Sequence, residues 1–267
     1  MTDVQKLIKY IAIALAVALI FVIFSSILSV LRIFTFIDDG DAVNDETTVY
    51  DVSQLITDLD FKISAAEFTV KTGDKLYIES NLKNLKVSEN GSKLTVVEKT
   101  KVNYKVNKAF LTLYIPKDTL FNDVEIEAGA GKISLGEFSC RSLSLELGAG
   151  DFSADTLTVN DECTIHGGVG EFTVYSGTIT DLEMEMGVGD MKLSSALYGT
   201  CDLSFGIGNA ELTLTGTKED YKLKIEKGIG SINLDGDKLT GDTTLGNGNT
   251  RIDIEGGIGN IDIKYGE

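Results

Sequence analysis

From residue 124 onward, apolar and polar residues alternate over short stretches that are interrupted by paired glycines. One template recurs, in the order apolar, x, apolar, x, x, Gly, apolar, Gly, x, apolar, x and usually apolar, as in EIEAGAGKISL, EMEMGVGDMKL and IEGGIGNIDI. Strict alternation is typical of β-strands, so each copy predicts two short strands around a glycine pair. The pairs are Gly129/Gly131, Gly148/Gly150, Gly168/Gly170, Gly187/Gly189, Gly206/Gly208, Gly228/Gly230 and Gly257/Gly259, with an imperfect copy at Gly246 and Gly248. A period of about 20 residues indicates a solenoid.

The parity of the apolar positions predicts where each copy bends. Counted from the first glycine, apolar residues at −5, −3 and +1 share one face of a strand, whereas those at +4 and +6 belong to the other. Because side chains alternate along a strand, the chain must reset its face near the second glycine, which can adopt positive φ. We therefore predict coils with Gly-x-Gly corners. We interpret position +1 as an inner layer that grows along the chain, through Ala130, Ala149, Val169, Val188, Ile207, Ile229 and Ile258.

Residues 50–123 lack the glycine template but have strand-like stretches such as DFKISAAEFTV and LTLYIP, separated by turn residues. They are predicted to form irregular β N-terminal coils that also cap the stack, since an open end would expose unpaired backbone groups. Residues 38–49 are predicted to be a short acidic linker. The regular Gly-x-Gly repeats occupy residues 124–267.

A long apolar segment precedes this region. Residues 10–31 contain no charged side chain, and the apolar run resumes after Arg32 as far as Ile37. Because about 20 apolar residues cross a bilayer as a helix, residues 10–37 are predicted to be a transmembrane anchor. A cleaved signal peptide is the alternative, but its apolar region is usually shorter. Lys6 and Lys9 lie in the tail of residues 1–9, which favours a cytoplasmic N-terminus and an extracytoplasmic C-terminal region.

These features together resemble one known family. An apolar anchor, an irregular β segment that ends in Leu113 to Pro116, and tandem G-[AVI]-G coils are similar to the bacterial toast-rack or putative-adhesin family of β-strand-repeat proteins of the cell envelope. The resemblance covers residues 50–267. It implies an all-β, single-stranded β-solenoid after one transmembrane helix, and it implies no catalytic residues.

Charge narrows the range of partners. The chain carries a formal net charge of −17, and residues 33–267 contain 21 basic and 40 acidic residues, a charge of −19. Such a surface repels nucleic acid, so a nucleic-acid partner is excluded. Twenty-eight glycines with a single proline favour regular corners over a flexible linker.

The sequence offers little catalytic chemistry. His166 is the only histidine and occupies position −2, where other copies place glutamate, so it is expected to face outward. The Gly-x-Gly pairs lack the third glycine of a dinucleotide fingerprint and the nine-residue period of a calcium roll. Cys140, Cys163 and Cys201 are expected to be core residues without a disulfide, because Cys163 and Cys201 would lie two coils apart. We predict no catalytic residue and no cofactor.

Acidic residues recur at positions −4 and −2. If coils stack in register, neighbouring members of each column lie about 4.8 Å apart, so the columns form an acidic strip. The strip could gather Ca²⁺ or Mg²⁺, which prefer oxygen ligands, or a cationic peptide, or it could simply keep the face soluble. Its acidic members are Glu125, Glu127, Glu146, Glu183, Glu185, Asp202, Glu226, Asp253 and Glu255.

The sequence thus predicts a non-enzymatic, membrane-anchored protein of the cell envelope with a structural, adhesive, ligand-binding or stress-sensing role. Its partner would be an envelope protein, a cationic peptide or a glycan. The alternative is a glycan-active lyase or hydrolase that uses paired carboxylates on a β-helix.

Overall fold

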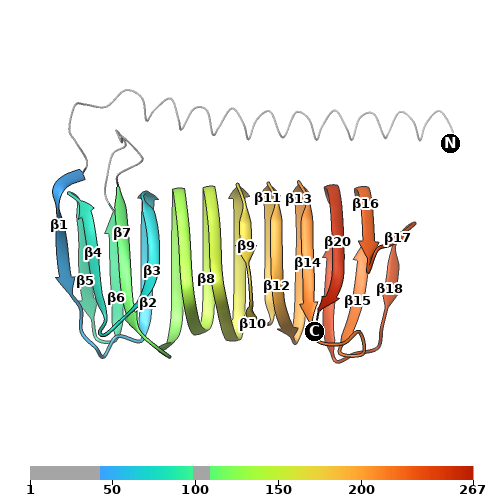
Figure 1. The fold of residues 1–267 in the computed structure, drawn as a ribbon, viewed down its shortest axis with the longest axis horizontal. Coiled ribbons are helices and arrows are strands. Elements are labelled where there is room, and N and C mark those ends of the chain that lie inside the picture. The colour runs from blue at the N-terminus through green and yellow to red at the C-terminus, as the bar shows by residue number, and fades with distance from the viewer. Residues whose placement is uncertain (1–42, 99–108, 267) are drawn as a thin grey trace, which may run out of the picture.

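The computed structural model describes residues 43–98 and 109–266, and all regular structure in these residues is β-strand. The strands stack into a rod whose long axis is perpendicular to the strand direction (Figure 1). Within these residues there is no helix long and apolar enough to cross a membrane. The predicted anchor, residues 10–37, lies outside them.

The strands follow one another closely along the chain. Their bounds are β1 Val43–Asp51, β2 Asp58–Ala65, β3 Glu67–Gly73, β4 Tyr77–Leu82, β5 Leu85–Asn90, β6 Lys93–Glu98, β7 Phe110–Pro116, β8 Leu120–Val169, β9 Phe172–Val174, β10 Gly177–Thr180, β11 Leu182–Val188, β12 Met191–Tyr198, β13 Thr200–Ile207, β14 Ala210–Thr215, β15 Tyr221–Glu226, β16 Ile229–Leu234, β17 Asp237–Leu239, β18 Thr243–Leu245, β19 Thr250–Glu255 and β20 Ile258–Gly266. β8 runs continuously through several corners.

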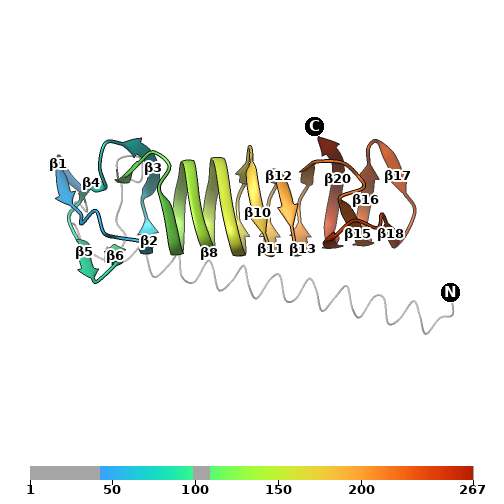
Figure 2. The same ribbon diagram turned by 90° about the horizontal axis from the view of Figure 1, so that it is seen from below.

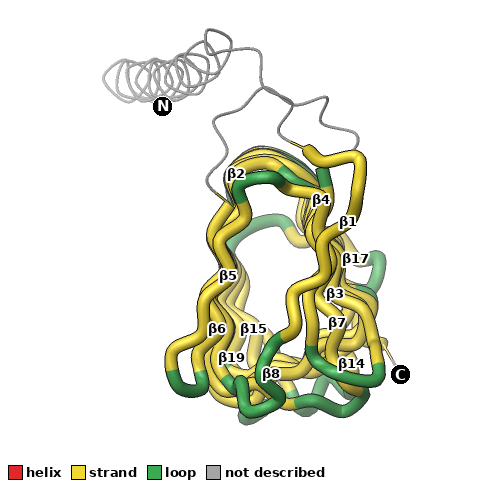
Figure 3. The backbone as a smooth tube through the Cα atoms, turned by 90° about the vertical axis from the view of Figure 1, so that its left-hand side faces the viewer, coloured by secondary structure: helices red, strands yellow, loops and turns green. Residues whose placement is uncertain are grey.

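Each central coil is one turn of a parallel solenoid. β11 pairs in parallel with β8 on one side and β13 on the other, and β12 pairs in the same way with β9 and β14. β10 forms a third, shorter side between β8 and β12. Viewed along the rod, the two long walls meet at a narrow arch (Figure 3). The all-β fold predicted from the repeat is therefore present.

The core fills the space between the walls. Positions −5, −3, +4 and +6 point inward, so that residues such as Leu203 and Leu212 are about 1% exposed or less. Aromatic rings stack between neighbouring coils, as Phe152 and Phe172 do with centroids 4.7 Å apart and ring planes 8° from parallel. Parallel stacking places like residues over like residues, so a single apolar position in the template becomes a continuous inner column.

The order of coils in space differs from their order in sequence at both ends. β2 lies between β6 and β8, and β3 lies between β7 and β8, so the second coil of the chain, β6 with β7, lies outside the first. At the other end, β19 lies between β13 and β15, and β20 lies between β14 and β16. Figures 1 and 2 show β20, in red, beside β16 and inside the stack. The last coil of the chain is therefore inserted inside the stack. The stack therefore does not follow the order in which the glycine pairs occur along the chain.

Antiparallel strands close both ends of the rod. β4 and β5 pair antiparallel with β7 and β6, and β17 and β18 pair antiparallel with β16 and β15. Short antiparallel strands change the hydrogen-bonding pattern at an exposed edge, which limits end-to-end association. Gly246 and Gly248 follow β18 and belong to this cap, so the imperfect glycine copy is not a coil. Residues 43–49 are also not a linker, because β1 pairs antiparallel with β4.

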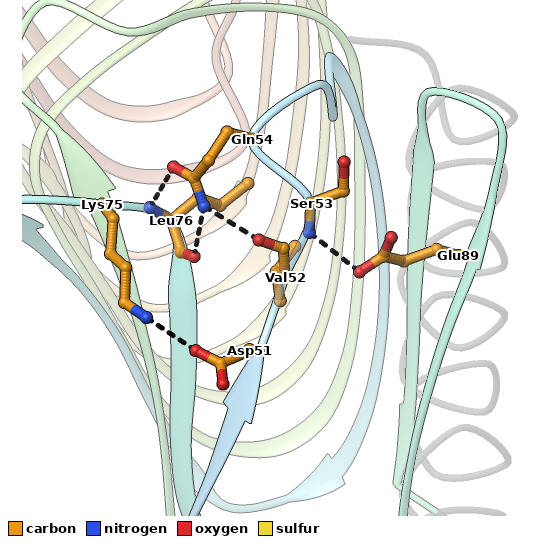
Figure 4. Close-up of polar contacts among 7 residues, drawn as sticks. All are labelled: Asp51, Val52, Ser53, Gln54, Lys75, Leu76 and Glu89. Carbon is orange, nitrogen blue, oxygen red and sulfur yellow. Dashed lines mark hydrogen bonds and ion pairs between the residues drawn. The ribbon is translucent and has the colours of Figure 1, made fainter.

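Polar side chains fasten β1 and the segment after it to the cap (Figure 4). The Gln54 amide acts like a strand backbone: its Nε2 donates to the Leu76 carbonyl at 2.9 Å, and its Oε1 accepts the Leu76 N–H at 2.8 Å. The Lys75 ammonium lies 2.6 Å from the Asp51 carboxylate. The start of the described chain is thus held at several points.

Candidate functional site

The Gly-x-Gly arches form one long edge of the rod. The second glycine of every regular pair has positive φ, from 128° at Gly131 to 149° at Gly259. A Cβ on such a glycine would also meet the coil below, since at Gly189 it would lie 1.8 Å from the Gly170 carbonyl oxygen. Glycine is required at this position for two reasons: the backbone has positive φ, and the neighbouring coil leaves no room for a side chain.

The corner predicted at Gly150 does not separate two strands, so the prediction of two short strands around each glycine pair is wrong there. Gly150 is exposed and lies inside β8, which continues on both sides of it. Its φ of 146° belongs to the mirror image of the β region, which glycine adopts readily. The chain therefore changes direction at Gly150 while its backbone stays extended. β8 runs in the same way through Gly129, Gly131, Gly148 and Gly168.

The first glycine of each pair has a different role, which the repeat pattern alone does not reveal. A Cβ on Gly187 would lie 2.4 Å from the Gly168 carbonyl oxygen, and one on Gly206 would lie 2.1 Å from that of Gly187. Neither residue has positive φ. The first glycine therefore lets successive arches approach closely, whereas the second turns the chain.

The residue between the two glycines points outward, and the interpretation of position +1 as an inner layer is wrong. Val169 and Val188 are each 44% exposed, Ile258 is 48% exposed and Ile229 is 69% exposed. The side chain at the apex of an arch lies on its convex side. Parity alone placed the change of face after position +1. The exposed side chains show that the chain changes face before position +1.

A ladder of amide and carboxylate side chains follows the second glycine. The Asp190 Oδ1 accepts the Asn209 N–H at 2.9 Å, and the Asn260 Oδ1 accepts the Ser231 N–H at 3.3 Å and its hydroxyl at 2.6 Å. Asn260 donates in turn to the Asn209 Oδ1 through its own Nδ2 at 3.3 Å. These hydrogen bonds connect coils that are neighbours in the stack, so Asn260 lies between Asn209 and Ser231 although it comes last in the sequence. Position +3 varies in sequence, yet every member except Lys132 has a side-chain oxygen acceptor, which could have indicated the ladder.

The predicted acidic strip occupies one wall of the rod. Glu183 pairs in register with Asp202, and Asp202 with Asp253, so these three carboxylates lie on adjacent rungs. In the second column Glu185 lies between His166 and Ser204, and Glu255 lies between Ser204 and Glu226. The exposed position of His166 matches the expectation of an outward-facing residue.

Basic side chains interrupt this strip. Lys62 forms an ion pair with Glu127, and Lys224 forms one with Glu226 at 2.7 Å. The hydrogen bond from Arg251 lowers the pKa of Asp253 below its ordinary value. Among the described residues, no three His, Cys, Asp or Glu side chains converge in a way that could hold a metal ion. Cation binding stays one of the hypotheses for the strip.

An open groove of about 570 Å³ crosses the wall near the N-terminal cap, and its lining includes Asp58, Lys93, Asp123, Glu125 and Glu162. The hydroxyl of Ser92 lowers the pKa of Asp58, and the backbone N–H of Asp123 acts in the same direction. A glycosidase needs one carboxyl group with a raised pKa as its general acid. The shift at Asp58 has the opposite sign.

The cysteine thiols are poorly suited to nucleophilic chemistry. All three are buried and unbridged, and Cys163 is separated from Cys201 by the coil that contains Leu182. Burial raises the pKa of Cys140 to about 12 and that of Cys201 to about 11. Since the thiolate is the reactive form, these side chains serve packing.

Comparison with family models identifies the family of this chain. The family model Toastrack DUF4097 matches residues 56–264, and the chain belongs to this family. No curated protein matches.

Similar solved structures include a protein named "putative adhesin" from Bacteroides fragilis NCTC 9343, with 15% identity, a TM-score of 0.42, and coverage of 84% of this chain and 100% of the other. Another is a protein named "putative cell adhesion protein" from Clostridium sporogenes ATCC 15579, with 18% identity, a TM-score of 0.36, and coverage of 83% and 99%.

Proposed function

We propose that this chain is a non-enzymatic, membrane-anchored protein of the cell envelope that displays its acidic solenoid outside the cytoplasm. Its role would be structural, adhesive, ligand-binding or sensory. The uncharged segment 10–31, with Lys6 and Lys9 before it, supports the anchor and its orientation. Family membership and the names of similar structures support an adhesive or surface role.

The observation that carries this proposal is the form of the described surface. The stacked walls give a rigid rod of roughly 40 Å at about 4.8 Å per coil. Exposed polar side chains repeat along its walls, and the groove near the cap is open. A long repetitive face suits recognition of an extended or repetitive partner, such as an envelope protein, a cationic peptide or a glycan.

Protease accessibility tests the topology. Trypsin is added to intact protoplasts that express the chain with one epitope tag before residue 1 and another after residue 267. We expect loss of the C-terminal tag and retention of the N-terminal tag, with both tags lost after detergent lysis. A C-terminal tag that resists trypsin until lysis would refute the extracytoplasmic assignment.

A glycan-active enzyme is the alternative from another class. It would require two of the groove carboxyl groups as an acid and a base, and the lowered pKa of Asp58 suits only the base of such a pair. Release of reducing ends from purified cell-wall glycan, lost in a D58N variant that melts like the wild type, would establish this alternative and displace the non-enzymatic role.

A further inference from the structure

An apolar ridge runs along the arch edge. We define it as the five residues Val169, Val188, Ile207, Ile258 and Ile229, in their order in space. Each pairs in register with its neighbour on the next coil. Four of them are 44% to 69% exposed, and Ile207 is intermediate. Contiguous exposed aliphatic side chains indicate an interaction surface more strongly than scattered ones do.

The arch itself does not require large residues at this position. Ala130 and Ala149 occupy it in the first two regular coils, and their second glycines turn with the same positive φ. The side chain grows from alanine through valine to isoleucine along the rod, although it contributes little to the core. Folding of the corner therefore gives no reason for the increase.

The polar column beside the ridge changes in the same direction. Position +3 carries the charged residues Lys132, Asp151, Glu171 and Asp190 beside the small and medium residues, and then the uncharged Asn209, Asn260 and Ser231 beside the isoleucines. The edge thus becomes both more apolar and neutral toward the C-terminal cap. Two neighbouring columns change together, in a protein whose formal net charge is −17.

The chain enters the solenoid at this same edge. β3 leaves the arch edge, β7 runs parallel to β3, and β4 is antiparallel to both β7 and β1, so β1 also begins at the arch edge. Figure 1 shows the start of β1 at the edge where β11 and β13 end. Only residues 38–42 separate the proposed anchor from β1, and five residues span at most about 17 Å. The contacts of Figure 4 then fasten the end of β1 to the cap.

We propose that the apolar ridge rests in the interface of the bilayer that carries the anchor, so that the rod lies along the membrane. This inference rests on the proposed membrane anchor. The anchor holds the N-terminal end, where the edge residues are alanines. The isoleucines provide a second contact with the membrane at the C-terminal end of the rod. Without it, the anchor alone would leave that end free to move away from the bilayer. Aliphatic side chains inserted at the headgroup boundary give such reversible contact.

Tryptophan fluorescence tests the proposal, because the chain contains no tryptophan. The full chain carrying I258W is reconstituted in phosphatidylcholine and phosphatidylglycerol vesicles with or without brominated acyl chains. The matched control is Y198W, since Tyr198 is 53% exposed against 48% for Ile258. Tyr198 ends β12 just before β13 begins, whereas Ile258 pairs with Ile207 at the other end of β13. The two sites therefore lie on opposite edges of the rod.

We expect brominated lipid to quench I258W emission and to leave Y198W emission unchanged. The additional change I229N should reduce the quenching of I258W without changing the melting temperature. Flotation of the vesicles separates the two proposals, since a chain that does not float has no anchor. A chain that floats but whose I258W emission is unquenched would overturn the ridge contact.

Two other results would also overturn it. Equal quenching at both positions would mean that the solenoid has no preferred edge toward lipid. Emission of I258W that is blue-shifted but unquenched, and that depends on protein density in the vesicle, would assign the ridge to a second copy of the chain.

Discussion

Alanine substitutions can separate the two roles of the arch glycines, because the chain offers all four combinations of backbone conformation and space. Gly189 has φ +145°, and an added Cβ would lie 1.8 Å from a backbone oxygen. Gly187 has the close approach, at 2.4 Å, without positive φ, and Gly236 has φ +86° with nothing within 4 Å. Gly241 has neither constraint.

The expected costs follow from these geometries. G241A should be neutral or stabilise the fold by about 0.4–1 kcal/mol, since alanine restricts the unfolded chain. G236A should cost about 1–2 kcal/mol for a Cβ at positive φ. G187A should cost about 1–3 kcal/mol, because the coils must separate locally. G189A combines both effects, so we expect at least about 3 kcal/mol.

Thermal unfolding of the full chain in detergent micelles, followed by far-UV circular dichroism, measures the order of the four variants. One kcal/mol shifts the melting temperature of a protein of this size by roughly 2–4 °C, so G189A should melt about 6–12 °C below the wild type. Hydrogen exchange should show the loss of protection centred on the two coils that meet at the arch. If G189A melts no lower than G236A, close stacking of the arches does not explain the second glycine.

Other contacts make narrower predictions. N260L removes the side-chain acceptor between two coils and should cost about 1 kcal/mol in urea unfolding, whereas N260D should cost less because it keeps the acceptor. Q54A removes a side chain that pairs like a strand and should cost about 1–3 kcal/mol, with increased exchange confined to the N-terminal cap; exchange spread over the whole rod would contradict this. Because the Ser92 hydroxyl depresses the pKa of Asp58, it contributes stability above the unfolded pKa of about 4 that is lost as pH falls through the folded pKa. S92A should therefore raise the Asp58 pKa measured by NMR and destabilise the chain near neutral pH but not at the lowest pH. Millimolar Ca²⁺ should not raise the melting temperature beyond monovalent salt of equal ionic strength; a rise that E183Q abolishes would establish a cation site on the strip.

The repeat made the coil predictable from sequence, because one template fixes both the inward positions and the corner glycines. Position +1 was misassigned because parity locates a change of face only to within a few residues. Leu203 and Ile207 share parity in the sequence, yet only Leu203 is fully buried, since the arch intervenes between them. The order of the coils in the stack could not be predicted, because all copies share one template and any copy can pair in register with any other. Ordinary alternation gave no sign that β17 and β18 run antiparallel.

The inserted position of β19 and β20 determines when the rod can be completed. β15 and β16, which precede them in the chain, have no neighbouring coil to pair with until residues 250–266 have been made and delivered. A chain that is synthesised or threaded across a membrane from its N-terminus can build the central coils as they emerge, since these pair with what is already present. The C-terminal end of the rod can form only after β19 and β20 have been made, because these two strands pair with a coil on each side. Premature termination near residue 250 would thus leave a finished rod body with an unpaired parallel edge and a detached cap.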